Sequence, residues 1–173
     1  EIFTANEIGS NLCDIFKIDK EHICIFFADA TEKGVAQGLY MIKAKSMLKK
    51  ALLTNTPEKA LLLVNKELFK NREKHIPLKI FIGIFNLHSG VLQTFNAGHV
   101  DPVIKSKNGN TSFINGPVNP LLGASADSAF IPLPLQLNAG DNIFFYSNDI
   151  IESLNTEGEK YGGKRLLDII SAA

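Results

Sequence analysis

The order of apolar and polar positions predicts two short strands followed by two helices in the N-terminal part of the chain. The runs over 12–18 and 22–29 are rich in apolar residues and are separated by Asp19-Lys20-Glu21, a polar break typical of a tight hairpin. A helical repeat of apolar positions then extends from 34 to about 53. Asn55-Thr56-Pro57-Glu58 offers a polar N-cap and a proline for the first turn, so a second helix is predicted over 56–70.

The helix over 34–53 carries two neighbouring apolar stripes. One stripe contains Val35, Leu39 and Ile42, and the other contains Met41, Ala44, Leu48 and Ala51. So broad an apolar surface predicts that this helix is buried against a sheet.

The remainder of the chain predicts antiparallel strands and one closing helix. Turn sequences such as His88-Ser89-Gly90 and Asn108-Gly109 separate short apolar runs, as in β-hairpins. The strands are expected over 80–87, 91–96, 102–105, 111–114, 130–137 and 142–147, and the helix over 163–170. We therefore expect an α+β protein, a four-layer α-β-β-α sandwich of two antiparallel sheets flanked by helices.

Composition narrows the class of protein. With 173 residues, 45% of them hydrophobic, the chain can bury one core. Eighteen basic residues balance eighteen acidic ones, which argues against a nucleic-acid partner. No apolar run approaches the roughly 20 residues of a membrane span and no signal-peptide pattern opens the chain, so we expect a soluble, cytoplasmic domain without direct membrane insertion. Because the chain starts at Glu1 and stops at Ala173 within a helical pattern, we expect it to be a fragment of a longer regulatory protein.

The two cysteines favour packed thiols over a disulfide. Cys13 and Cys24 lie in predicted neighbouring strands among apolar residues.

Four segments carry a resemblance to one known family, in the family's order. They are Gly9-Ser10-Asn11-Leu12-Cys13-Asp14, then Ala28-Asp29-Ala30-Thr31-Glu32-Lys33-Gly34, then Phe95-Asn96-Ala97-Gly98-His99, and finally Ala139-Gly140-Asp141 with Tyr146-Ser147-Asn148-Asp149 and Glu152. These segments resemble the Gly-Gly-Asp, Gly-Asp-Val-Ser-Gly-His-Gly, Asn-Ala-Gly-His and Tyr-Thr-Asp-Gly motifs of the SpoIIE-like branch of the PPM (protein phosphatase 2C) metal-dependent serine/threonine phosphatases. The resemblance implies a single SpoIIE-like phosphatase domain over 1–173.

The resemblance also implies a two-metal site for Mn²⁺ or Mg²⁺. Asp29 would be the catalytic, metal-bridging carboxylate, and the carbonyl of Ala30 would contact one metal. Asn11 and Asn148 occupy positions where the family has aspartate. Each replacement keeps the size of the side chain but removes a negative charge, which weakens the neutralisation of two divalent cations. Asp149 could compensate if the backbone turns there, because neighbouring side chains of a strand point to opposite faces.

Two further positions leave alternatives open. Glu32-Lys33 stands where the family has Gly-His, and Lys33 could approach a phosphate or neutralise Asp29, although an exposed turn pair is favoured. His99 could act as a general acid or could tie down a loop by hydrogen bonding.

Three functions follow from these patterns. The first is a phosphoserine/phosphothreonine phosphatase acting on a phosphorylated regulatory protein of the anti-anti-sigma type in bacterial signalling. The second is a pseudophosphatase that serves as a partner-binding signalling domain, motivated by Asn11 and Asn148. The third is an unrelated α+β binding module, which is kept because fold and function are separate inferences.

Overall fold

The computed structural model describes residues 11–29, 35–70 and 77–172. The chain divides into two compact units, here called the first unit (1–99 and 116–135) and the second unit (100–115 and 136–173). Each unit combines an antiparallel sheet with helices, which confirms the predicted α+β class.

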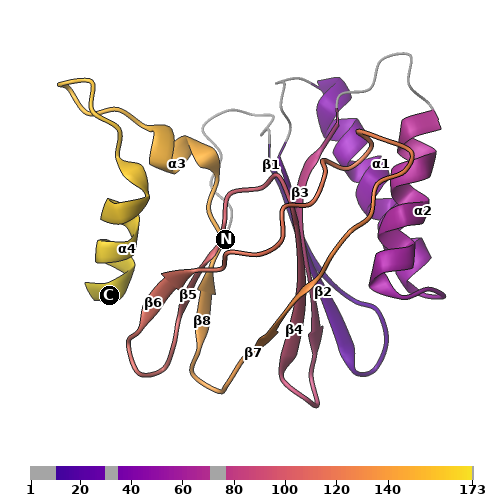
Figure 1. Ribbon diagram of the computed structural model, residues 1–173, viewed down its shortest axis with the longest axis horizontal. Helices are drawn as coiled ribbons and strands as arrows, with labels where there is room; N and C mark the ends of the chain where they lie inside the picture. The colour runs from indigo at the N-terminus through magenta and orange to yellow at the C-terminus, as the bar shows by residue number, and fades with distance from the viewer. Residues whose placement is uncertain (1–10, 30–34, 71–76, 173) are drawn as a thin grey trace. The chain divides into compact units, whose positions relative to one another are not determined.

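A five-stranded sheet forms the framework of the first unit. Its strand order is β1-β2-β3-β4-β7, and β1 to β4 are joined as successive antiparallel neighbours (Figure 1). The strands are β1 Asn11–Lys17, β2 His22–Asp29, β3 Lys79–Asn86, β4 Val91–Ala97 and β7 Leu133–Gln136. The predicted first hairpin is therefore confirmed, with Asp29 as the last residue of β2.

Successive side chains of β2 point alternately to the two sides of the sheet, and one of these, here called the helix-facing side, packs against the helices. Cys24, Phe26 and Ala28 are buried in one apolar core together with residues of both helices. Their opposed partners in β3 belong to the same core and are Ile84, Ile82 and Ile80. Since successive side chains of a strand point to opposite faces, Phe27 and Asp29 project from the other side.

Helices α1 (Val35–Leu52) and α2 (Pro57–Lys70) lie side by side against the helix-facing side of the sheet (Figure 1). In α1 the buried residues are Met41, Ala44, Leu48 and Leu52. The expectation that the whole broad apolar surface is buried was wrong, because Val35, Leu39 and Ile42 are 58%, 63% and 48% exposed. A helix that lies on the outside of a sheet contacts it along one stripe only, and the neighbouring stripe faces away.

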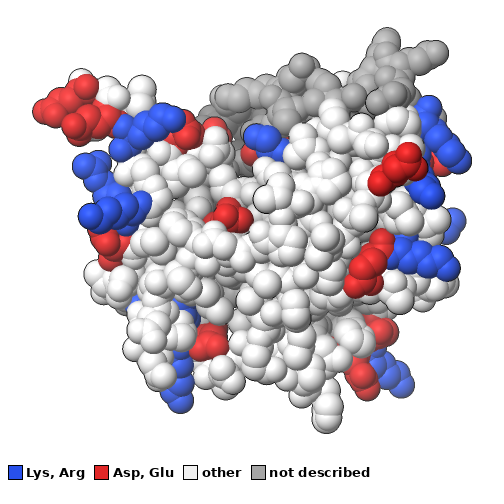
Figure 2. All heavy atoms as spheres, in the orientation of Figure 1, with Lys and Arg blue, Asp and Glu red and all other residues white. Residues whose placement is uncertain are grey.

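Helix α2 begins and packs as its sequence predicts. The hydroxyl of Thr56 accepts a weak hydrogen bond from the Lys59 amide at 3.4 Å, just before Pro57. Leu61, Val64 and Leu68 lie in the core. Charged side chains of both signs alternate over the exposed surface of this helix pair (Figure 2), in keeping with the balanced charge of the chain.

The second unit contains a three-stranded sheet of order β6-β5-β8 and two helices. The elements are β5 Val103–Lys105, β6 Thr111–Phe113, β8 Asn142–Phe144, α3 Asn148–Glu152 and α4 Gly162–Ala172. Lys105 ties α4 to the sheet, since its Nζ donates to the carbonyl oxygens of Ile170 and Ser171 at 3.0 and 3.1 Å. Among the described residues, no helix combines the length and apolar character needed to cross a membrane.

Two strands are shorter than the sequence predicted. The run over 130–137 forms a strand only at Leu133–Gln136, and the run over 142–147 only at Asn142–Phe144. These strands follow each other along the chain but belong to different sheets. Sequence proximity therefore did not decide their pairing.

Candidate functional site

Asp29 ends β2 directly opposite Asn11, the first residue of β1. Opposed residues of an antiparallel pair project from the same face of the sheet, with Cβ atoms about 5 Å apart. The structure therefore brings together two of the predicted site residues, one carboxylate and one amide.

Lys79, the first residue of β3, lies opposite Asp29 on its other side. Asn11, Asp29 and Lys79 thus form one row across three strands, here called the Asp29 row. Lys79 is not among the site residues predicted from the sequence. Its only sequence signal is its place at the start of a β-branched run, because the register of β2 against β3 is what places it beside Asp29.

An aromatic cluster lies next to the Asp29 row on the same face. Phe27 and Phe81 are opposed residues of β2 and β3. The ring of His99 lies 5.9 Å from the Phe27 ring and 6.5 Å from the Phe81 ring, between centroids, and is inclined to both. These contacts favour an anchoring role for His99 at the end of the Asn-Ala-Gly-His segment over the alternative of a general acid.

Gly98 allows the Asn-Ala-Gly-His segment to pack closely against the side chain of Leu121. It adopts a φ of +83°, and a Cβ built on it would lie 2.2 Å from Cδ2 of Leu121. A larger residue would be strained by its backbone and would also displace Leu121. The glycine is therefore needed where the strand end meets the loop that carries Leu121.

Asn148 and Asp149 lie in the second unit as the first two residues of α3. The strand expected over 142–147 is shorter than predicted and ends at Phe144, and α3 begins directly after Ser147, whose backbone is extended with φ −87° and ψ 157°. The backbone turn that Asp149 would need is thus present. Ligation by Asn148 and Asp149 stays a prediction, and Ala30, Glu32 and Lys33 lie outside the described residues.

The Asp29 row fits a hard divalent cation in donor type but not in charge. The oxygen atoms of Asp29 and Asn11 are the kind of donor that Mg²⁺ and Mn²⁺ prefer. However, the single carboxylate of the row is balanced by Lys79. Across the described ranges 11–29, 35–70 and 77–172, no group of three or more His, Cys, Asp or Glu side chains forms a metal cluster. The row alone therefore gives much less negative charge than two cations require.

A separate cavity of about 390 Å³ lies at the opposite end of β2, which begins at His22. It is lined by residues of the β1–β2 turn, the α1–α2 junction and the β3–β4 hairpin, among them Asp19, Asn55 and Gln93. Asp29 lies seven positions after His22 in the strand, which is roughly 23 Å along the sheet. This cavity is therefore distinct from the Asp29 row.

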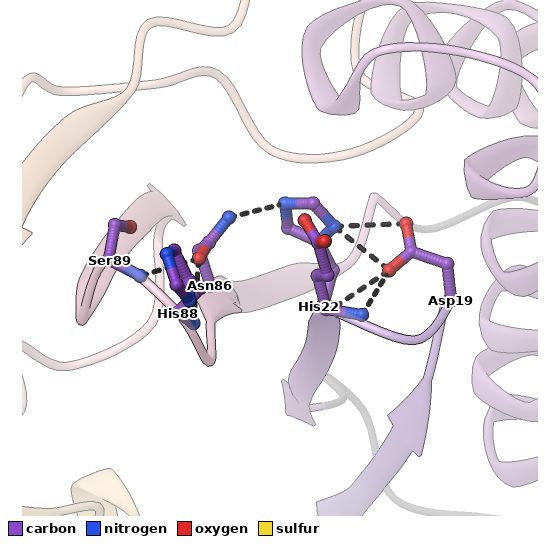
Figure 3. A network of polar contacts seen from close by, with 6 residues as sticks. Asp19, His22, Asn86, His88 and Ser89 are labelled. Atoms are coloured by element: carbon purple, nitrogen blue, oxygen red, sulfur yellow. Dashed lines mark hydrogen bonds and ion pairs between the residues drawn. The ribbon is translucent and has the colours of Figure 1, made fainter.

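The polar wall of this cavity is a closed hydrogen-bond network (Figure 3). Asn86 Oδ1 accepts from the backbone amides of His88 and Ser89 at 2.9 and 2.8 Å, so its Nδ2 must face His22 Nε2, 3.0 Å away. His22 Nε2 then accepts this hydrogen bond, and Nδ1 donates to the carboxylate of Asp19 at 2.9 Å. Backbone hydrogen bonds, first from the Glu21 amide, and the contact with His22 lower the pKa of Asp19. The network joins two hairpin turns, so it is first of all a structural connection.

The two α+β units have the architecture of phosphatase domains of the PP2C (PPM) class. The family model of stage II sporulation protein E (SpoIIE) matches residues 19–173, and the chain belongs to the SpoIIE family.

Solved structures show the same fold at low sequence identity. A Mycobacterium tuberculosis protein with RsbU and RsbW domains is 20% identical with a TM-score of 0.82, over 97% of this chain and 46% of that one. The PP2C phosphatase domain of SpoIIE from Bacillus subtilis, solved with a fragment of its regulatory domain, is 16% identical with a TM-score of 0.73, over 85% and 43%. RsbX in complex with magnesium is 10% identical with a TM-score of 0.67, over 97% and 81%. The chain spans less than half the length of the first two.

Proposed function

We propose that residues 1–173 form one divalent-cation-dependent protein serine/threonine phosphatase domain that acts in the cytoplasm on a phosphorylated regulatory protein of the anti-anti-sigma type. The observation that carries this proposal is the carboxylate of Asp29, which ends β2 within a chain of the SpoIIE family. The magnesium in the RsbX structure supports a divalent cation as cofactor. Substrate and cofactor are carried to this chain by the family resemblance.

The family resemblance gives the proposed ligands, all of which are oxygen donors. Asp29 and Asn11 would hold a cation from the Asp29 row, with the Ala30 carbonyl, Asn148 and Asp149 as further ligands. A bound Mn²⁺ or Mg²⁺ would supply charge stabilisation and a more acidic water. The Asp29 carboxylate would hold the cation and its water in position, and the side chain of Asn11 would contribute a neutral carbonyl oxygen beside it.

Phosphate release from a phosphoserine or phosphothreonine peptide tests the proposal. We expect release that rises with Mn²⁺ concentration and that falls at least about a hundredfold in Asp29→Asn, which keeps the shape of the side chain but removes its charge. Asp127→Asn, a change at an exposed carboxylate, is the matched control. A folded protein that releases no phosphate across a wide range of Mn²⁺ concentrations would refute the proposed activity.

A second candidate function, a partner-binding pseudophosphatase, is favoured by the low charge of the Asp29 row. Asn11 on one side and Lys79 on the other leave Asp29 as the row's only carboxylate. This function predicts that calorimetry detects at most weak binding of Mn²⁺. Tight binding of two Mn²⁺ ions would remove its main support.

A further inference from the structure

Lys79 is a charged residue beside the candidate catalytic carboxylate, and the family resemblance did not point to it. It lies opposite Asp29 in the β2–β3 ladder, so both side chains project from the same face of the sheet. A lysine has a long, flexible stem, and its ammonium can therefore reach the space in front of the Asp29 carboxylate.

The charge of Lys79 is not used elsewhere in the described part of the chain. Its side chain is half-buried, and none of the ion pairs among the described residues, Lys45–Asp14, His22–Asp19 and Lys160–Glu152, includes it. An ammonium that is partly removed from water is stabilised by an anionic partner. This position therefore favours an anion.

The stem of Lys79 also contacts the segment that carries His99. Its Cγ lies 3.5 Å from the position that a Cβ would take on Gly98, and Ile80, the next residue, is bridged to Gly98. Lys79 thus lies between two of the segments that define the family resemblance, the strand end at Asp29 and the Asn-Ala-Gly-His segment. This is the region in which a substrate of the proposed phosphatase would bind.

We propose that Lys79 is a phosphate-binding residue that contacts the phosphoryl group of a phosphoserine or phosphothreonine substrate at the Asp29 site. The inference rests on the proposed function for the identity of the substrate. Such a group carries about 1.5 to 2 negative charges near neutral pH. Because Asp29 contributes −1, Lys79 +1 and Asn11 nothing, the formal charge of the row is zero, and the row does not repel a phosphate. The ammonium supplies a point charge that can follow the phosphate oxygens.

Binding of inorganic phosphate and of free phosphoserine, followed by amide NMR or calorimetry, tests the inference. Titrations of the wild type, Lys79→Met, Lys79→Gln and Lys79→Arg are made first with EDTA and then with Mn²⁺. We expect both neutral variants to weaken phosphate binding about tenfold or more, and Lys79→Arg to retain it within about threefold, because the charge-assisted hydrogen bond depends on the cation. Lys17→Met is the matched control, since Lys17 is an exposed lysine of the same sheet that pairs with Ile23 at its far end.

Several results would overturn the inference. They are equal phosphate affinity in the wild type and the folded neutral variants, equal weakening by Lys17→Met, or no phosphate binding by the wild type in either buffer. Using both Met and Gln keeps the test decisive if one variant fails to fold. These measurements distinguish a failure of this inference from a failure of the proposed phosphatase function. Loss of phosphate binding at Lys79 supports the inference even without turnover, whereas turnover with a KM unchanged in Lys79→Met overturns it and leaves the phosphatase activity standing.

Discussion

Asn11 and Asp29 lie directly opposite each other at the ends of two antiparallel strands, so an amide occupies the place beside the candidate catalytic carboxylate. The pairing is fixed by the whole β1–β2 register, which extends from this pair to Lys17 and Ile23. The β1–β2 register therefore fixes the positions of Asn11 and Asp29 relative to each other. Because Asn11 is a neutral amide, the pair carries one negative charge, whereas a pair of carboxylates would carry two.

Restoring the carboxylate should strengthen cation binding. We expect Asn11→Asp to increase Mn²⁺ affinity about tenfold, because a second negative charge about 5 Å from Asp29 attracts a cation shared between them. The double variant Asn11→Asp/Asn148→Asp should bind still more tightly. Calorimetric titration with Mn²⁺ measures both effects, and Asn108→Asp, a change at an exposed hairpin turn, serves as control. Unchanged affinity in the double variant would mean that these positions do not converge on one cation.

The ion pair between Asp14 of β1 and Lys45 of α1 should make stability depend on pH. Its Oδ2–Nζ distance is 2.9 Å, and the hydrogen bond from Lys45 is the main cause that lowers the pKa of Asp14 below its usual 3.8. A lowered folded-state pKa means that the stabilisation is complete above the usual pKa and is lost as pH falls through the lowered value.

We therefore expect Asp14→Asn to reduce the free energy of unfolding by about 0.5–1 kcal/mol at neutral pH, a range set by the partial exposure of the pair. The difference from the wild type should disappear in strong acid. Urea unfolding of both proteins from neutral pH to about pH 2 measures it. A difference that stays constant over this range would show that packing, and not charge, explains the effect.

Asn65 should be one of the more sensitive polar positions of the first unit. It is fully buried in α2, donates from Nδ2 to the carbonyl of Ser125 at 2.7 Å and accepts at Oδ1 from the Gly123 amide at 2.7 Å. Asn65→Leu would leave both backbone groups without their partner, so we expect the free energy of unfolding to fall by about 2–4 kcal/mol. Lys66→Ala, at an exposed position of the same helix, should change it by less than about 0.5 kcal/mol. A loss below about 1 kcal/mol in Asn65→Leu would mean that the loop finds other partners.

The two cysteines should differ in reactivity without forming a disulfide. Both are free, and the register places them on opposite faces of the sheet, since Cys13 pairs with Phe27 whereas Cys24 pairs with Phe16. Burial raises the pKa of Cys24 to about 12, and burial also raises the pKa of Cys13, which stays partly accessible.

With iodoacetamide at about pH 8, a value below the ordinary thiol pKa, we expect slow modification of Cys13 and none of Cys24 until the protein unfolds. Peptide mass spectrometry before and after urea treatment separates the two sites. Equal labelling of both cysteines in the native protein would contradict the packing described for Cys24.

Much of the fold could be predicted from sequence because its signals are local. The hairpin before Asp29, the capped start of α2 and the glycine turns depend on residues that are close in the chain. The errors arose where a partner far along the chain decides the outcome. The stripe of Val35, Leu39 and Ile42 looks apolar whether or not a sheet covers it, and the run after Phe144 looks like a strand although it turns into α3.

The sequence by itself predicted a carboxylate, Asp29, at the end of an apolar strand, and the family resemblance made it the candidate catalytic residue. Only the tertiary structure decided which side chains lie beside that carboxylate. Lys79 follows Asp29 after two helices, and no local pattern connects them. Their opposition is set by the register of β2 and β3, in which Phe26 and Ile82 must share the core-facing side. Packing of that core therefore places a lysine beside Asp29, and with it the charge of the site.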